Sequence, residues 1–151
     1  MKTFRFNLER VLEWRTIQLK AAEEKLTQLR QQLSTLLQQE EQIRAAYRDS
    51  AERLLSAQTL GGAELQVLAA YRVRTDNLYQ ALQKQKAQCE ALMHEQRQRL
   101  LKARKDHRIL EKLKETRFKN WVYLNERDIE ATAAEAFLSK WARLDAENKN
   151  G

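Results

Sequence analysis

The sequence predicts an all-α protein: a long antiparallel two-helix coiled-coil hairpin whose second helix overhangs the first. The chain has 151 residues, no proline and only three glycines, so it lacks most of the residues that mark turns and strand boundaries. Charged residues make up 32% and aromatic residues 7%, which is typical of a long helix rather than of a packed globule. Apolar residues also recur at alternating steps of four and three, the periodicity of a coiled coil.

The first helix is expected over about residues 8–59. Twelve of its fifteen core-facing positions are apolar, and together these positions form a stripe that we call the seam: Leu8, Leu12, Arg15, Leu19, Ala22, Leu26, Leu29, Leu33, Leu36, Glu40, Ile43, Tyr47, Ser50, Leu54 and Ala57. A seam that keeps its phase over so many heptads needs a partner helix along its length. Arg15, Glu40 and Ser50 interrupt it. These polar residues either fix the helix register or mark loose packing, with side chains that reach water.

Two starts of this helix are compatible with the sequence. Asn7 is a good N-cap, and Glu9 and Glu13 in the first turns suit the positive end of the helix dipole. Alternatively, the helix begins near Thr3 and places Phe4 on the seam side.

Gly61 and Gly62 form the one internal break, and we expect a tight reversal over about residues 60–62, with glycine in the left-handed conformation. The second helix is then expected over about residues 63–141, followed by a frayed tail over 142–151. Its sevenfold series runs from Leu68 through Cys89 to Leu138, while its second seam position slides, for example between Leu92 and Met93. The whole chain, residues 1–151, is predicted to form a single coiled-coil domain.

An antiparallel pair that reverses at this point has facing residues whose numbers sum to about 121 to 123, so Leu33 faces the region of Cys89. Beyond about Lys114 the second helix has no partner. That overhang carries the apolar residues Phe118, Trp121, Tyr123, Leu124, Phe137, Leu138 and Trp141. They either form a docking surface or pack on Phe4, Phe6 and Trp14.

Positive charge is concentrated in one stretch of the second helix. Residues 94–119 contain ten Lys and Arg against four Asp and Glu, in a chain of formal net charge +7. A basic helix of this kind suits an acidic protein surface, a nucleic acid or an anionic membrane. The run is interrupted by Glu95, Asp106, Glu111 and Glu115. Within it, no aromatic residue that could stack on a base occurs before Phe118, which argues against a nucleic acid.

We expect no enzyme activity, no cofactor and no metal. The sequence has no Gly-rich phosphate loop, no nucleophile elbow and no metal-binding spacing. His94 and His107 are expected to be solvated members of the basic face, and Cys89 to be a small buried seam residue. One cysteine fits a reducing, cytoplasmic location. No stretch approaches the ~20 apolar residues of a membrane span, and the N-terminal residues do not form a cleaved signal.

Several motifs together resemble the FliJ family of flagellar export proteins. They are Phe4-x-Phe6-x-Leu8-Glu9-x-Val11-Leu12-x-x-Arg15, the glycine-marked reversal, Tyr71-x-x-Arg74-x-x-x-Leu78-x-x-Ala81-Leu82, and Leu110-Glu111-Lys112-Leu113-Lys114-Glu115. The resemblance covers nearly the whole chain. Arg74 stands where the family tends to carry an aromatic residue, and the acidic motif near the family's C-terminus is matched only loosely by Asp128, Glu130 and Glu135.

The resemblance implies a non-enzymatic part of the flagellar type III export apparatus, similar to the gamma-subunit stalk of rotary ATPases. The implied partners are the hexameric export ATPase, the cytoplasmic domain of the export gate and, as a further candidate, export chaperones. The implied location is cytoplasmic, at the inner face of the inner membrane and peripheral to it at most. The candidate partner-binding residues are Tyr71, Arg74 and Leu78 for the gate, and Arg97, Arg99, Lys102, Arg104, Lys105, Arg108, Lys112 and Lys114 for the ATPase.

Two alternatives stay open at this point. The chain is also compatible with the equivalent stalk of a virulence type III secretion system, which differs in the machine but not in the physics. A basic coiled coil that binds nucleic acid or another anionic surface is the second alternative, although the preferred interpretation includes no nucleic-acid partner.

Overall fold

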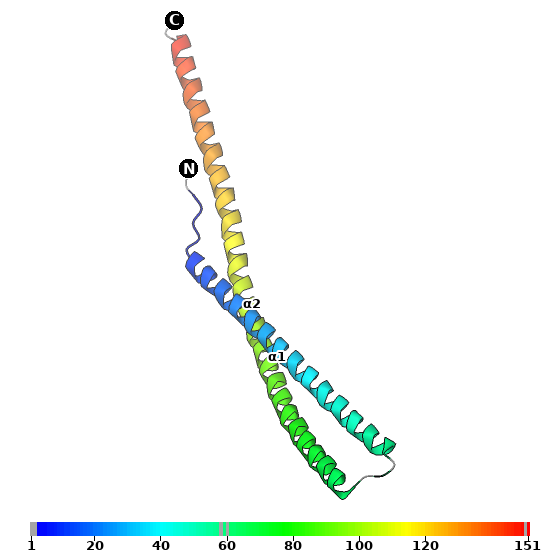
Figure 1. Cartoon of the computed structure of the whole chain (residues 1–151). Coiled ribbons are helices and arrows are strands. Elements are labelled where there is room, and N and C mark those ends of the chain that lie inside the picture. Colours follow the sequence, from blue (N-terminus) through cyan, green and yellow to red (C-terminus); the bar gives the residue numbers. More distant parts are fainter. Residues whose placement is uncertain (1–2, 58, 60, 150) are drawn as a thin grey trace. The chain divides into compact units, whose positions relative to one another are not determined.

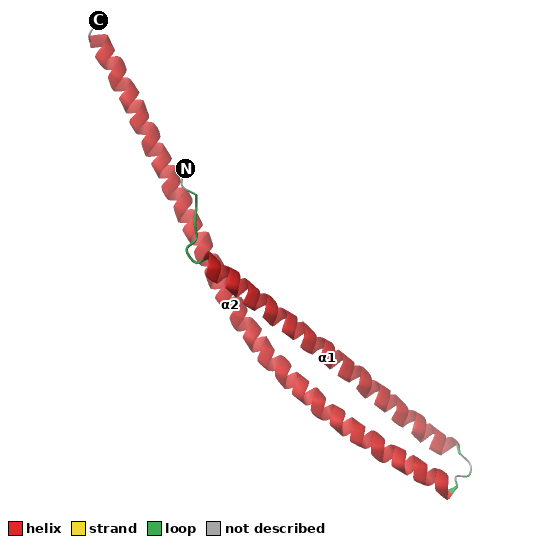
Figure 2. Cartoon of the chain, turned by 60° about the vertical axis from the view of Figure 1, so that its left-hand side comes forward, coloured by secondary structure: helices red, strands yellow, loops and turns green. Residues whose placement is uncertain are grey.

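The computed structural model of the chain describes residues 3–57, 59, 61–149 and 151 (Figure 1). It contains two helices, α1 (Glu9–Ser56, 48 residues) and α2 (Gly62–Lys149, 88 residues), and the residues it describes include no strand (Figure 2). The two helices pack against each other in antiparallel directions. The predicted all-α two-helix hairpin is therefore confirmed.

The ends of the helices differ in part from the expected ones, and α1 ends at Ser56 rather than at about residue 59. α1 begins at Glu9, whose amide donates to the Phe6 carbonyl at 3.1 Å, so the start near Thr3 is wrong. Gly62 is the first residue of α2 and has no left-handed conformation, contrary to expectation. Of the predicted turn, Leu60 lies outside the described residues.

The C-terminal tail was expected to fray from residue 142, but α2 continues to Lys149. Most residues from Ala142 to Lys149 are good helix formers, namely Ala, Arg, Leu, Glu and Lys, and there is no glycine or proline before residue 151 to end the helix. Asp145 and Lys149 lie one helical turn apart, and the ion pair between Lys149 Nζ and Asp145 Oδ2 at 3.4 Å stabilises the last turn of α2. Lysine in the last turn also suits the negative end of the helix dipole.

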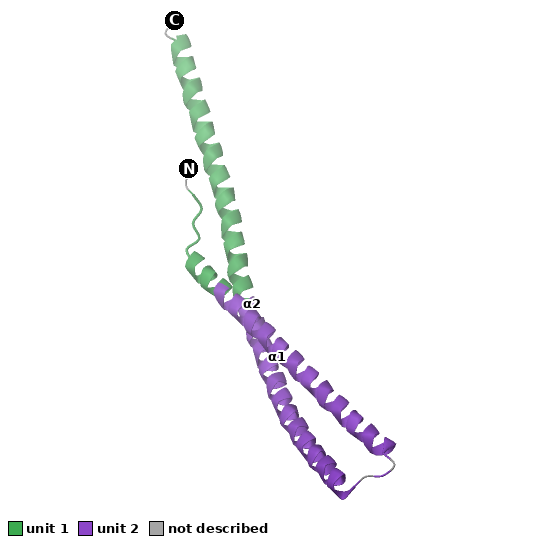
Figure 3. Cartoon of the chain, in the orientation of Figure 1, with its two compact units in different colours: residues 1–16, 105–151 green, residues 17–104 purple. Residues whose placement is uncertain are grey.

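The chain forms two compact units (Figure 3). Unit 1 comprises residues 1–16 and 105–151, and unit 2 comprises residues 17–104. Each unit contains part of both helices. The physical reason is that a residue of a helix pair contacts only residues near it along the axis, so a two-helix hairpin has no central core that would join distant parts.

Unit 2 is held together by a narrow seam between the two helices. Leu26 and Leu29 of α1 are buried, as are Leu82, Cys89, Met93 and Leu100 of α2. Leu29, Cys89 and Met93 form one cluster, on which the half-buried Leu33 and Leu36 pack. The Cys89 thiol donates to the Leu29 carbonyl at 3.5 Å. The buried position of Cys89 is thus confirmed. The predicted seam of the first helix is also confirmed, apart from Tyr47, which is exposed, and Ala57, which lies beyond the end of α1.

The structure also decides which residues occupy the second seam position of α2. Tyr79, Met93 and Leu100 face α1, whereas their neighbours Leu78, Leu92 and Arg99 are exposed. Leu78 and Arg99 therefore lie on outward faces of unit 2. The Leu78 side chain is open to solvent, whereas Arg99 is paired with Glu95 of its own helix.

Buried polar residues in unit 2 have partners across or along the helices. Gln96 is 4% exposed, and its Nε2 donates to the Ala22 carbonyl at 3.1 Å. Ser50 donates to the Tyr47 carbonyl at 2.8 Å. Glu40 is 5% exposed and accepts from Arg44 and Lys86. The polar seam positions of unit 2 are consequently bonded rather than loosely packed.

Unit 1 pairs the N-terminal segment with the middle of α2. The Phe4 and Phe118 rings meet edge to face at 5.2 Å, and Trp121 lies 6.0 Å from Phe4. Lys114 Nζ and Glu9 Oε2 form an ion pair at 2.8 Å, and Arg15 pairs with Asp106 at 3.1 Å. Part of the aromatic overhang thus packs on the N-terminus, as one of the two interpretations predicted.

The rest of the overhang is open. Every residue from Glu126 to Lys149 is exposed, and Phe137, Leu138 and Trp141 keep 64 to 68% of their surface accessible. The predicted overhang of the second helix is therefore present within unit 1.

Facing residues agree with the predicted register. In unit 1, Arg15 lies opposite Asp106 and Glu9 opposite Lys114, and the residue numbers of these pairs sum to 121 and 123. In unit 2 the corresponding sums are 118 for Leu29 with Cys89 and 126 for Glu40 with Lys86. The spread arises because one residue contacts several residues of the facing helix.

Candidate partner-binding surfaces

The three residues expected to contact the export gate lie together on one flank of α2 in unit 2. Tyr71, Arg74 and Leu78 are spaced by three and four residues, which places them on one face of a helix. With Ile43 and Ala46 of α1 they line a surface hollow of about 530 Å³. Leu78 is 54% exposed. The hollow presents an apolar floor, a tyrosine and a guanidinium to solvent.

A second hollow continues this flank of α2. It has a volume of about 610 Å³ and shares Arg74 and Leu78 with the first, adding Ala69, Ala70, Val73 and Asn77. Val73 is exposed and apolar. The sequence analysis did not select Val73, and it placed Ile43 in the seam only and not beside Leu78.

The basic residues of unit 2 divide between two faces of α2. Arg97 and Arg104 are seven residues apart and share a face, while Arg99 is two residues from Arg97 and points elsewhere. Arg99 is held by Glu95 at 2.6 Å, and Arg104 lies 3.5 Å from Glu23 of α1. Lys102 is exposed. The four residues therefore do not form one patch.

The basic residues of unit 1 differ in their availability. Lys105, Arg108 and Lys112 are exposed. Lys114 is half-buried and paired with Glu9 of the facing segment, so it stabilises the helix pairing. Its assignment as a partner-binding residue is therefore not supported by its position. The predicted register already placed Lys114 opposite Glu9, since their numbers sum to 123, but the candidate list did not use this pairing.

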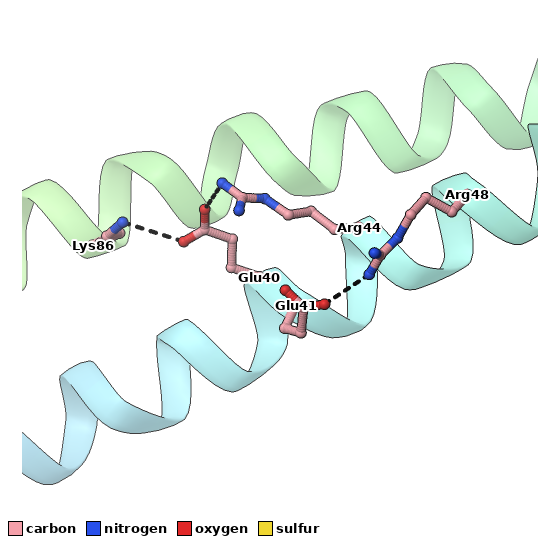
Figure 4. Close-up of polar contacts among 5 residues, drawn as sticks. All are labelled: Glu40, Glu41, Arg44, Arg48 and Lys86. Carbon is pink, nitrogen blue, oxygen red and sulfur yellow. Dashed lines mark hydrogen bonds and ion pairs between the residues drawn. The ribbon is translucent and has the colours of Figure 1, made fainter.

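A charged cluster crosses unit 2 beside these surfaces (Figure 4). Glu40 lies between Arg44 Nη2 at 2.6 Å and Lys86 Nζ at 3.2 Å, and its carboxylate points at α2. The Lys86 ammonium, through its hydrogen bond, lowers the pKa of the Glu40 carboxyl below its ordinary value, and the charge of Arg44 acts in the same direction while burial opposes both. Glu41 separately holds Arg48 at 2.8 Å. This seam position is thus an ion cluster that joins the helices.

A polar hollow that the sequence reasoning missed lies on the other flank of unit 2. It has a volume of about 490 Å³ and is lined by Glu41, Ile43, Arg44, Tyr47, Arg48, Thr75, Asp76 and Tyr79. Arg72 lies over the Tyr47 ring at 5.1 Å and donates to its hydroxyl at 3.2 Å. Because arginine and carboxylate side chains alternate here and pair with each other, no unpaired charge of one sign dominates the hollow.

His107 is not the solvated residue that the sequence predicted. Its side chain is 15% exposed, its Nε2 lies 3.0 Å from the Thr16 hydroxyl, and its Nδ1 lies 3.6 Å from Glu111. The Thr16 hydroxyl donates its single proton to the Leu12 carbonyl, so it accepts from Nε2–H. His107 therefore helps to join the two segments of unit 1. His94 is exposed, as expected.

Within residues 3–57, 59, 61–149 and 151, no three His, Cys, Asp or Glu side chains gather closely enough to hold a metal ion. Over that same part of the chain, neither helix contains a stretch that is sufficiently long and apolar to cross a membrane.

Comparisons with known proteins add no relative. The chain matches no family model, no curated protein and no solved structure.

Proposed function

We propose that this chain is a non-enzymatic stalk of the flagellar type III export apparatus that links the export ATPase ring to the export gate. The observation that carries the proposal is the combination of a two-helix hairpin with exposed basic residues on α2 and a separate apolar hollow around Leu78. The sequence resemblance to the FliJ family supplies the identity of the machine. In this proposal the protein works in the cytoplasm, at the inner face of the inner membrane.

Weak electrostatic docking suits such a stalk. Two packed helices are about 20 Å across, since each helix with its side chains is about 10 Å wide. Arg97, Lys105 and Arg108 are exposed, so an acidic ring attracts them mainly through long-range charge. Contacts of this kind form fast and release easily, and they leave the ring able to change its state around the hairpin.

The gate contact is proposed to use a different chemistry. The hollow around Tyr71, Arg74 and Leu78 offers apolar surface with one tyrosine and one arginine, residue types that are common at the centres of protein interfaces. Since ATPase binding and gate binding use different side chains, substitutions should separate them. Export chaperones are a further candidate partner, for which no surface is assigned.

The test is a titration of purified protein with the export ATPase and with the cytoplasmic domain of the gate. Replacing Arg97, Arg104 and Arg108 together by Glu should weaken ATPase binding at least tenfold, roughly the effect of three reversed surface charges. Helicity should not change, because these side chains are exposed. Leu78→Ala should mainly weaken gate binding.

Salt and nucleic acid provide the controls. ATPase binding should weaken as salt shortens the Debye length below about 10 Å. Duplex and single-stranded DNA serve as competing anions. If the triple reversal left ATPase binding unchanged and abolished DNA binding, the chain would be a nucleic-acid binder and the stalk function would be wrong.

A further inference from the structure

A groove in unit 2 is lined by more positive than negative side chains, three arginines and one glutamate. We call it the arginine groove; it has a volume of about 430 Å³. Two matching sets of residues line it, Glu23, Leu26, Thr27 and Arg30 from α1 and Arg97, Leu100, Leu101 and Arg104 from α2. Each set has the spacing i, i+3, i+4 and i+7, which is one flank of a helix.

The two ends of the groove carry different charge pairs. At one end Glu23 faces Arg104, with Oε1 3.5 Å from Nη2. Because the helices run antiparallel, moving one heptad forward on α1 and one heptad back on α2 leads from this pair to Arg30 and Arg97. The register that brings Glu23 to Arg104 at one end of the groove therefore brings Arg30 to Arg97 at the opposite end. There, two positively charged guanidinium groups face each other.

Arg30 and Arg97 differ from the other arginines near the groove in their lack of a carboxylate partner among the described residues. No acidic residue stands three or four positions from Arg30 or Arg97 in the sequence. Among the residues that the structure describes, neither guanidinium takes part in an ion pair, in contrast to Arg99 and Arg104 nearby. Two like charges that face each other are unfavourable, and an anion placed between them relieves the repulsion.

The floor and wall of the groove are apolar. Leu26 and Leu100 are buried at its base, and Leu101 is 58% exposed on its wall. A guanidinium binds a carboxylate in a bidentate, planar geometry, and the neighbouring leucines favour an apolar side chain beside that carboxylate. Nucleic acid fits less well, because no aromatic side chain lines the groove to stack on a base.

We propose that the arginine groove binds an acidic segment of a protein partner, whose carboxylates lie between Arg30 and Arg97 and whose apolar side chain packs on Leu101. The inference deepens the proposed function by giving the ATPase contact a defined place. The identity of the partner rests on the proposed stalk function, whereas the chemistry of the groove does not depend on it. Arg30, which the sequence reasoning did not select, becomes a partner-binding residue.

A peptide titration tests the groove without the export ATPase. The probe is a synthetic 12-residue peptide of glutamates with one central leucine, added to the full-length protein at low ionic strength and followed by amide NMR shifts. Arg30→Gln and Arg97→Gln should each weaken binding about 3- to 10-fold, and the double variant should weaken it further. Leu101→Ser should weaken binding as well. Arg99→Gln is the matched control, since Arg99 is already paired with Glu95 and should show no change.

Thermal stability gives a second readout. Arg97→Glu places a carboxylate opposite Arg30 in the relation that Glu23 and Arg104 already have, so it should raise Tm while abolishing peptide binding. A lowered Tm together with unchanged peptide binding would overturn the proposal, and so would equal losses in the Arg99→Gln control. Stronger binding of a 12-nucleotide single strand than of the peptide, lost in Arg97→Gln, would overturn it in favour of nucleic acid.

The groove and the stalk function can fail separately. Peptide binding that depends on Arg30 and Arg97, without any binding of the export ATPase, would support the groove and contradict the stalk function. ATPase binding that survives both substitutions would support the stalk function and contradict the groove.

Discussion

Truncation of Leu29 is expected to cost more stability than any truncation of its exposed neighbours. Leu29 is 8% exposed and packs in the cluster with Cys89 and Met93. Leu29→Ala removes about three carbon groups from that cluster, and at about 0.8 kcal/mol for each buried group the lost transfer free energy is about 2.4 kcal/mol. The cavity adds little, because the half-buried Leu33 and Leu36 beside it can move inward. We expect a loss of about 2 to 3 kcal/mol in the free energy of unfolding.

Urea unfolding followed by circular dichroism measures this loss. Gln32→Ala is the control within the same helix, since Gln32 is exposed and should cost under about 0.5 kcal/mol. Leu33→Ala should fall between the two, because Leu33 is half-buried. Similar losses for Leu29→Ala and Gln32→Ala would show that the α1 residues have been assigned to the wrong face.

Two further predictions concern the ion cluster and the helix pairing. Because Lys86 lowers the pKa of Glu40, this carboxylate stabilises the fold above its ordinary pKa of 4.5, and the stabilisation is lost as pH falls through the lowered value. Urea unfolding between about pH 6 and 3 should therefore show a smaller acid loss for Glu40→Gln than for the wild type; an equal or larger loss would contradict the role of the cluster. Spin labels at the exposed Gln31 and Gln88 should lie about 10 to 20 Å apart, given interaxial distances of 8 to 10 Å plus label arms. A separation several times larger would instead indicate an open chain that pairs with a second copy.

Local sequence determined most of the secondary structure. The absence of proline, the glycine pair and the apolar period over Leu8 to Leu54 fix two helices and the side of the first that is buried, because each of these signals acts within a few turns. The antiparallel register also followed, since a short reversal permits only one alignment of the two helices. The helix beyond residue 141 was not predicted. It continues to Lys149 because its residues favour helix and no residue there signals a helix end.

Only the tertiary structure decided what each polar residue does, because the role of a charge depends on what faces it across the helix pair. Lys114 and Arg97 are alike in the sequence, yet Lys114 pairs with Glu9 and stabilises unit 1, while Arg97 forms no ion pair with any residue that the structure describes. His107 shares the basic run with the exposed His94 but lies against Thr16. In the sequence, Glu40 is only a polar interruption of the apolar period. In the structure it forms an ion pair with Lys86 of the facing helix. Periodicity specifies which side of a helix is buried, whereas pairing across the interface depends on residues far apart in the chain.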